Sequence, residues 1–252
     1  MHRVTVSRTL LFLFMTLQSE PLSLQIQRTI QNGDSFAAVE IMARQGDAKA
    51  IARAYSEVTR DLYRKFHDLS AFVIASRQGI EYLLARASEL DSTDSALATD
   101  LRLSAKAMAY NLASNAWPGW NEPGSATPND IEAGLDAARL NLRLAIDLKP
   151  GPEPMFNAHW IIGALELARG RANEAIRSYE QARQIADDAN LHSYLLLAQG
   201  SVALAKIVGN IDSAGGQREL AQVKTSLNSE NLKDGKFFSD QLDTSYQALI
   251  KR

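Results

Sequence analysis

Residues 159–182, HWIIGALELARGRANEAIRSYEQA, hold the spacing that decides the fold. Apolar residues recur at three- and four-residue intervals on both sides of Gly170, which is the pattern of two amphipathic helices joined by a tight turn. Where the two helices would cross, the sequence has small residues and one aromatic: Gly163, Ala175, Tyr179 and Ala182. A small residue lets two helix axes approach closely, and an aromatic side chain fills the space beside it. The stretch therefore predicts a closely packed helical hairpin.

The same helical periodicity continues along the chain, and no segment has the alternation of a β-strand. Helix starts are indicated by side chains that can accept hydrogen bonds from free amides, namely Asp34, Asp94 and Asn129-Asp130. Helix ends are indicated by glycines that can adopt a left-handed conformation, namely Gly33, Gly46, Gly170 and Gly209. The predicted helices are 21–31, 34–45, 47–66, 69–90, 94–116, 129–149, 153–169, 171–187, 190–208, 215–228 and 236–251.

The opening stretch resembles a tetratricopeptide repeat (TPR). Ile162-Gly163 matches the Leu-Gly pair of the family's first helix, and Ala175, Tyr179 and Ala182 match the small-aromatic-small pattern of its second. The stretch departs from the family at His159, where a tryptophan is usual. The resemblance implies an all-α fold, a right-handed solenoid of about four helical hairpins with capping helices at its ends. A degenerate helical-repeat pattern continues on both sides of this unit.

The chain is expected to form one helical-repeat domain over 21–252, with an insertion at 117–128. At the N-terminus, 1–20, Arg3 and Arg8 precede an apolar run, as in a secretory signal peptide. The run is too short to span a bilayer, and no small-x-small cleavage pattern follows it. The segment is therefore either a signal peptide or an apolar extension, and the sequence favours neither an exported nor a cytoplasmic location.

Composition removes several functional classes. The net charge of −2 provides no electrostatic reason to expect a nucleic acid partner. With no cysteine, the chain has no disulfide, thiol nucleophile or iron–sulfur cluster. The metalloprotease, serine hydrolase, phosphate-loop and dinucleotide motifs are also missing, so we expect no cofactor and no metal. No run is long enough for a transmembrane span.

The resemblance implies a groove lined by the first helices of successive hairpins. In the 159–182 unit this face would be apolar, with Asn157, Trp160 and Ala164, and it lacks the lysine and asparagine pairs with which family members hold chaperone C-termini. We therefore predict an apolar or helical ligand rather than a chaperone tail. Trp160 fits a core position as well as a groove position. His159 with His192 would make a poor metal site without further ligands, so a packing role is expected for His159.

The insertion 117–128 contains three prolines, two glycines and two tryptophans. Proline and glycine exclude a helix, whereas Trp117 and Trp120 are costly to leave in water. The loop is therefore either a lid that contacts a ligand or a segment anchored on its own hairpin by the tryptophans. Asn111 and Asn115, four residues apart on the preceding helix, suit either a ligand's backbone or the loop's own amides, and asparagine chemistry favours the loop.

The candidate binding residues are thus Asn111, Asn115, Trp117, Trp120, Asn157, His159 and Trp160. The leading hypothesis is a non-enzymatic module that binds a protein or peptide. The alternatives are an assembly subunit, whose C-terminal apolar segment caps the array or docks onto a second copy, and an all-helical enzyme. No set of residues supports a reaction, and the sequence decides neither the partner nor the oligomeric state.

Overall fold

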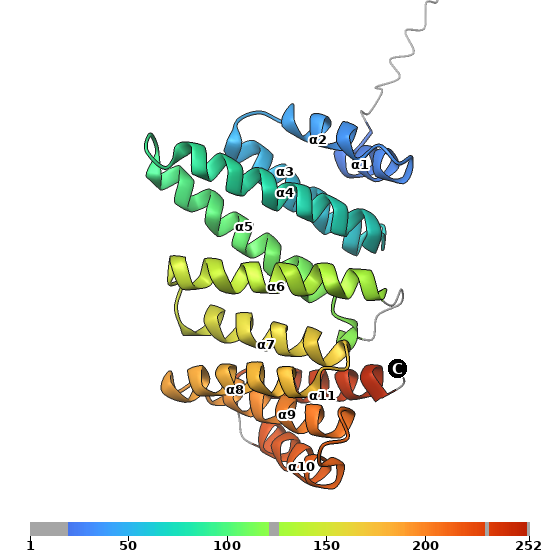
Figure 1. Ribbon diagram of the computed structural model, residues 1–252, viewed down its shortest axis with the longest axis vertical. Coiled ribbons are helices and arrows are strands. Elements are labelled where there is room, and N and C mark those ends of the chain that lie inside the picture. The colour runs from blue at the N-terminus through green and yellow to red at the C-terminus, as the bar shows by residue number, and fades with distance from the viewer. Residues whose placement is uncertain (1–19, 121–125, 230–231, 251–252) are drawn as a thin grey trace, which may run out of the picture.

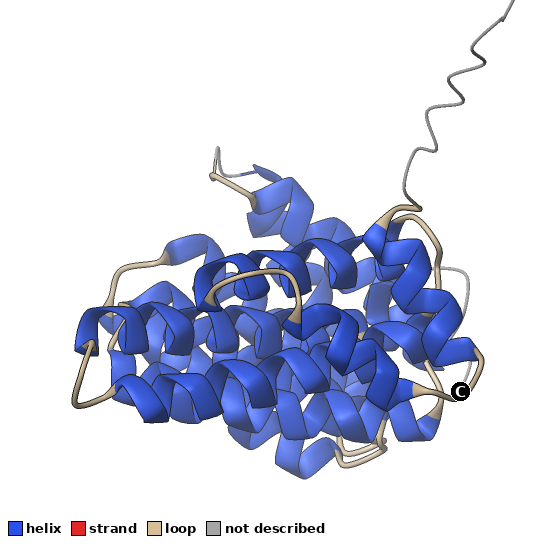
Figure 2. Ribbon diagram, turned by 90° about the horizontal axis from the view of Figure 1, so that it is seen from above, coloured by secondary structure: helices blue, strands red, loops and turns tan. Residues whose placement is uncertain are grey.

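The computed structural model describes residues 20–120, 126–229 and 232–250, and over these residues the protein is all-α. Figure 2 shows helices and loops and, in the described part of the chain, no strand. The elements are α1 (Leu22–Gln31), α2 (Ser35–Ala43), α3 (Ala48–Arg64), α4 (Leu69–Leu90), α5 (Ser95–Asn115), the 3₁₀ turn η1 (Pro118–Trp120), α6 (Pro128–Leu148), α7 (Pro152–Ala168), α8 (Ala172–Asp188), α9 (His192–Val208), α10 (Ser213–Ser229) and α11 (Gly235–Ile250). The helices predicted from the sequence are confirmed, each to within about two residues at either end.

Consecutive helices pack against one another, and Figure 1 shows them following the long axis of the molecule from α1 to α10. Odd-numbered helices that follow one another along the chain also touch: α3 contacts α5, α5 contacts α7 and α7 contacts α9. These four helices therefore share one face of the molecule, which we call the odd-helix face. Every candidate residue on a helix lies on α5 or α7, which are two of the four.

The α7–α8 pair has the close packing predicted from residues 159–182. A Cβ added to Gly163 would lie 2.7 Å from the Tyr179 ring and 3.1 Å from the Ala175 carbonyl oxygen. Tyr179, Ala175 and Ala182 are all buried. The glycine thus admits the aromatic ring at the crossing, as the spacing indicated.

Two of the three predicted helix starts are confirmed. The Asp34 carboxylate accepts a hydrogen bond from the Ala37 amide, and the Asp94 carboxylate accepts one from Leu97. The prediction for Asn129-Asp130 is confirmed in part: the Asp130 carboxylate accepts a hydrogen bond from the Thr127 amide at 2.9 Å, but the N-cap residue is Thr127. Proline suits the first position of a helix, so Pro128 begins α6 earlier than predicted. Asp130 then completes a capping box with Thr127.

Three of the four predicted helix-ending glycines, Gly33, Gly46 and Gly170, have positive φ angles. The prediction for Gly209 is wrong: its φ is −80°, and the left-handed residue is the next one, Asn210, at 50°. Gly209 serves close packing instead, because a Cβ there would lie 2.2 Å from the Cβ of Ala172.

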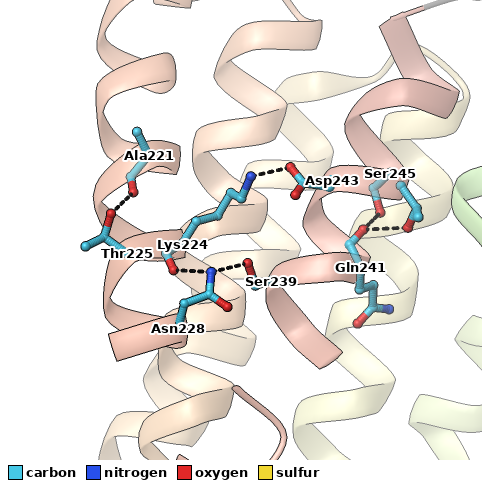
Figure 3. A network of polar contacts seen from close by, with 9 residues as sticks. Ala221, Lys224, Thr225, Asn228, Ser239, Gln241, Asp243 and Ser245 are labelled. Carbon is cyan, nitrogen blue, oxygen red and sulfur yellow. Dashed lines mark hydrogen bonds and ion pairs between the residues drawn. The ribbon is translucent and has the colours of Figure 1, made fainter. Parts of the chain in front are cut away.

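The last helix, α11, packs on α9, α10 and η1 (Figure 1). Figure 3 shows its polar contacts with α10, where Lys224 pairs with Asp243 and the Asn228 amide donates to the Ser239 hydroxyl at 2.9 Å. On α9, Gly200 leaves room for Leu242, since a Cβ on the glycine would come within 2.5 Å of the leucine methyl group. Phe238, Leu242 and Leu249 of α11 are therefore buried within their own chain, whereas Phe237 and Ile250 are exposed.

The Asp68 side chain links α1 to the turn between α3 and α4 through hydrogen bonds. Its carboxylate caps α4 through the Ala71 amide at 2.9 Å and accepts hydrogen bonds from Gln27 at 3.0 Å and Gln31 at 2.7 Å. Burial alone would raise the pKa of Asp68, but these three hydrogen bonds to the charged form outweigh it and hold the pKa below its ordinary value. A carboxyl whose pKa is lower in the folded state stabilises the fold above its unfolded-state pKa, and this stabilisation is lost as the pH falls through the folded-state pKa.

We therefore expect Asp68→Asn to lower the free energy of unfolding by about 1 kcal/mol at neutral pH. The difference from the wild type should shrink as the pH falls below about 4, because the wild-type carboxyl becomes protonated first in the unfolded state and then, below its lowered pKa, in the folded state. Urea unfolding across this pH range measures both values, with Asp34→Asn as the control for a helix cap without the contacts to α1. A difference that stays constant with pH would contradict the role of the charge.

Candidate functional site

A cleft of about 930 Å³ opens between α3 and α5. Its α3 wall carries Arg60 and Arg64, and its α5 wall carries Asn111 and Asn115. Trp120 of η1 contributes an aromatic surface to the same cleft. Three of the residues predicted from the sequence, Asn111, Asn115 and Trp120, are thus brought together.

The α3 wall follows from the helical period. Val58 and Leu62 point into the core, so Ser56, Arg60 and Arg64 fall on the outer side of the same helix. Both arginines are exposed, and neither forms a hydrogen bond or ion pair with any described residue. None of the described residues that line this cleft is acidic. Its α3 wall is therefore cationic, and no described lining residue supplies a counter-charge.

On the α5 wall, Asn111 is exposed and Asn115 is half-buried. The favoured expectation, that these amides hold the insertion, is not supported by the described part of the chain, where neither side chain forms a hydrogen bond. The insertion is held instead by Trp120, whose indole Nε1 donates to the Ser114 carbonyl oxygen at 2.9 Å. The η1 turn places the indole on the end of α5, and among the described residues the asparagine amides have no hydrogen-bond partner.

Trp117 anchors the insertion. It is only 3% exposed, and its ring meets Trp120 and Trp160 edge to face, with centroid distances of 5.1 Å in both cases. Gly119 passes directly over this ring, since a Cβ there would lie 2.0 Å from it. Trp117 thus acts as an anchor of the insertion on its own chain, which was one of the two alternatives. Trp120 packs against Trp117 and also lines the cleft. Residues 121–125 of the insertion lie outside the described residues.

The apolar groove predicted in the 159–182 unit is not present, and this prediction is wrong. Trp160 is 5% exposed, and its indole Nε1 donates to the Ser201 hydroxyl of α9 at 3.0 Å. Ala164 is fully buried. α9 and the Trp117 ring cover this part of α7, so Trp160 belongs to the core, which was the alternative drawn from the sequence.

The two remaining candidates lie on α7, away from the cleft lining. Asn157 is half-buried. His159 is also half-buried, and burial lowers the pKa of its imidazole. His192 is the first residue of α9 whereas His159 lies in the middle of α7, so the two histidines do not occupy equivalent positions. Nowhere in residues 20–120, 126–229 and 232–250 do three His, Asp or Glu side chains gather as a metal site would require.

The odd-helix face is therefore open over α3 and α5 and covered over α7 and α9. A chain of aromatic rings marks the covered half: Phe156 of α7 meets Tyr194 of α9 at 5.0 Å, and Tyr194 meets Phe238 of α11 at 5.1 Å. α11 thus covers part of α9 and contacts η1. Ligand access to this face is left at the α3–α5 cleft.

A second hollow, of about 430 Å³ between α8, α9 and α10, differs in its charges. There Arg183 pairs with Glu180, and Lys206 with Glu219. Its cations are neutralised by neighbours on the same walls, whereas those of the α3–α5 cleft are not.

Comparisons with known proteins do not assign the chain to a family. No family model matches the chain. A comparison with curated proteins gives no significant match either. Among the helices that the structure describes, none combines the length and the apolar character needed to cross a membrane.

The chemistry of the cleft is that of a binding site. Guanidinium and amide groups can donate hydrogen bonds to carboxylate and carbonyl oxygens, and the Trp120 ring offers an apolar surface. Arg60 and Arg64 were missed as candidates because α3 has no consensus residues of a repeat. The signal that could have found them is their spacing of four residues, which matches the spacing of Asn111 and Asn115 on the opposite wall.

Proposed function

We propose that the protein is a non-enzymatic module that binds a protein or peptide partner in the α3–α5 cleft. The observation that carries this proposal is the convergence of Asn111, Asn115 and Trp120 with two arginines that have no partner among the described residues, all in one cleft. Its volume lies in the usual range of ligand sites, about 300–1,000 Å³. Buried aromatic and arginine side chains contribute strongly to protein interfaces, and asparagine amides can pair with both groups of a peptide backbone.

We also propose that the helix pairs form a right-handed, TPR-like solenoid. The Gly163–Tyr179 crossing and the contacts between successive odd-numbered helices support this architecture. In such a solenoid the odd-helix face is the inner surface, on which extended ligands lie. The resemblance and the cleft then point to the same side of the molecule.

The proposal is tested by replacing Asn111 with a photo-crosslinking amino acid in the full chain in its native host. We expect irradiation to yield a discrete adduct, because a bound partner would lie within reach of this position. Gln181, exposed on α8 and outside the cleft lining, is the matched control and should give no such adduct. Adding Trp120→Ala to the Asn111 probe should reduce the adduct severalfold, since the aromatic wall is removed.

The absence of an adduct at both position 111 and position 115 would overturn the proposal. An adduct of the same mass and yield at position 181 would also overturn it, because the contact would not depend on the cleft.

A further inference from the structure

The cations of the cleft belong to a longer row along α3. A third hollow, of about 410 Å³, also lies between α3 and α5 and shares Ser56 and Arg60 with the α3–α5 cleft. The two hollows form one groove, and α3 lines it with Lys49, Arg53, Arg60 and Arg64. From Arg53 to Arg64 the row extends about 16 Å, given the rise of an α-helix.

The charge balance changes along this groove. Lys49 pairs with Asp100 at 3.7 Å, and Glu57 lines the same end. Toward η1, none of the described lining residues is acidic, and Arg60 and Arg64 form no hydrogen bond or ion pair with any of these described residues. The positive potential is therefore concentrated beside Asn111, Asn115 and Trp120.

From this arrangement we infer that the ligand of the α3–α5 cleft is an extended peptide segment with acidic side chains, held by Arg60 and Arg64. The inference rests on the proposed binding function and specifies its partner. Guanidinium groups pair with carboxylates in preference to neutral groups, and such bonds are about twice as strong as neutral ones. The asparagine amides on the opposite wall would hold the peptide backbone at the same level of the groove.

The spacing of the arginines specifies the peptide further. Side chains four residues apart on a helix lie about 6 Å from each other. In an extended peptide, alternate residues are about 6.6 Å apart and point to the same side. The arginines therefore match two acidic residues separated by one other residue, more closely than two acidic residues in succession.

A nucleic acid ligand fits this groove less well. A phosphate chain would meet Glu57 and Asp100 at the far end of the row, and the protein as a whole carries a net charge of −2. Nucleic acid binding normally relies on a broad basic surface. A peptide can place its acidic residues only where the arginines are.

The test is selection of a phage-displayed library of random peptides on the full-length protein. We expect the selected peptides to be enriched in acidic residues, with the acidic-x-acidic spacing prominent. The affinity of a selected peptide, measured by fluorescence anisotropy, should fall by at least about tenfold in the double variant Arg60→Glu, Arg64→Glu. The same loss is expected when its acidic residues are replaced by glutamine.

Arg143→Glu on α6 is the matched control, because Arg143 is likewise exposed and without an ion pair to a described residue, but lies outside the groove. It should leave the affinity unchanged. Circular dichroism checks that each variant is folded, and Arg60→Gln with Arg64→Gln repeats the test without introducing negative charge.

The outcomes distinguish the acidic peptide ligand from the binding function of the cleft. Selected peptides without acidic enrichment, or unaffected by Arg60 and Arg64, would overturn the acidic ligand and leave peptide binding in place. Failure to select any peptide, or binding of a single-stranded oligonucleotide in place of peptides, would overturn the inference. Only a failure of the crosslinking at positions 111 and 115 as well would remove the binding function.

Discussion

Replacement of Tyr179 by alanine is expected to lower the free energy of unfolding by about 3–5 kcal/mol. Tyr179 is 2% exposed, and its ring fills the space that Gly163 leaves between α7 and α8. Removing the ring creates a cavity at this crossing, and the fully buried Ala175 and Ala182 are too small to fill it. Urea or thermal unfolding followed by circular dichroism measures the loss.

Tyr179→Phe is the control, because it keeps the ring and removes only the hydroxyl group. It should cost less than about 1 kcal/mol, because the hydroxyl forms no hydrogen bond with any residue that the structure describes. If Tyr179→Ala cost no more than Tyr179→Phe, the α7–α8 crossing would not depend on the ring, and the argument from residues 159–182 would fail.

Replacement of Trp117 by alanine should have an effect of the same size, about 3–5 kcal/mol. Trp117 contacts Trp120, Trp160 and Gly119, so its ring links the insertion to α7. Without it, η1 loses the surface on which it packs, and Trp160 loses an edge-to-face partner. Equilibrium unfolding of the full-length protein measures this effect.

Trp120→Ala should behave differently from Trp117→Ala. Trp120 is half-buried and lines the cleft, so its removal should cost less stability but reduce the yield of crosslinking from position 111. Comparison of the two variants separates the anchor from the binding surface. Equal losses of stability with no change in crosslinking would show that both tryptophans are only structural.

Local sequence signals predicted the elements of the fold because each depends on neighbouring residues. Periodic apolar residues indicated the helices, Asp34 and Asp94 indicated helix starts, and Gly163 with Tyr179 indicated the close crossing. The errors also had local causes: Pro128 moved the start of α6, and Gly209 served packing rather than a left-handed turn.

The candidate site was predictable only in part, because it depends on contacts between distant segments. Asn111, Asn115 and Trp120 could be chosen from a short stretch, since spacing and loop composition singled them out. The partnership with Arg60 and Arg64 requires α3 to lie beside α5, and no consensus residue indicated this. The burial of Trp160 likewise depends on Ser201, 41 positions later in the chain.

The position of α11 also limits where helix pairs could be added to the array. α11 follows α10 in the chain but contacts η1, which lies between α5 and α6. An additional helix pair inserted after α10 would carry α11 further along the array, by about the 8–10 Å that separates packed helices. The contact with η1 would then be lost, and the covered half of the odd-helix face would need a different cover. The contact between α11 and η1 therefore fixes the number of helix pairs between them. Repeats could be duplicated without loss of this contact only on the N-terminal side of η1.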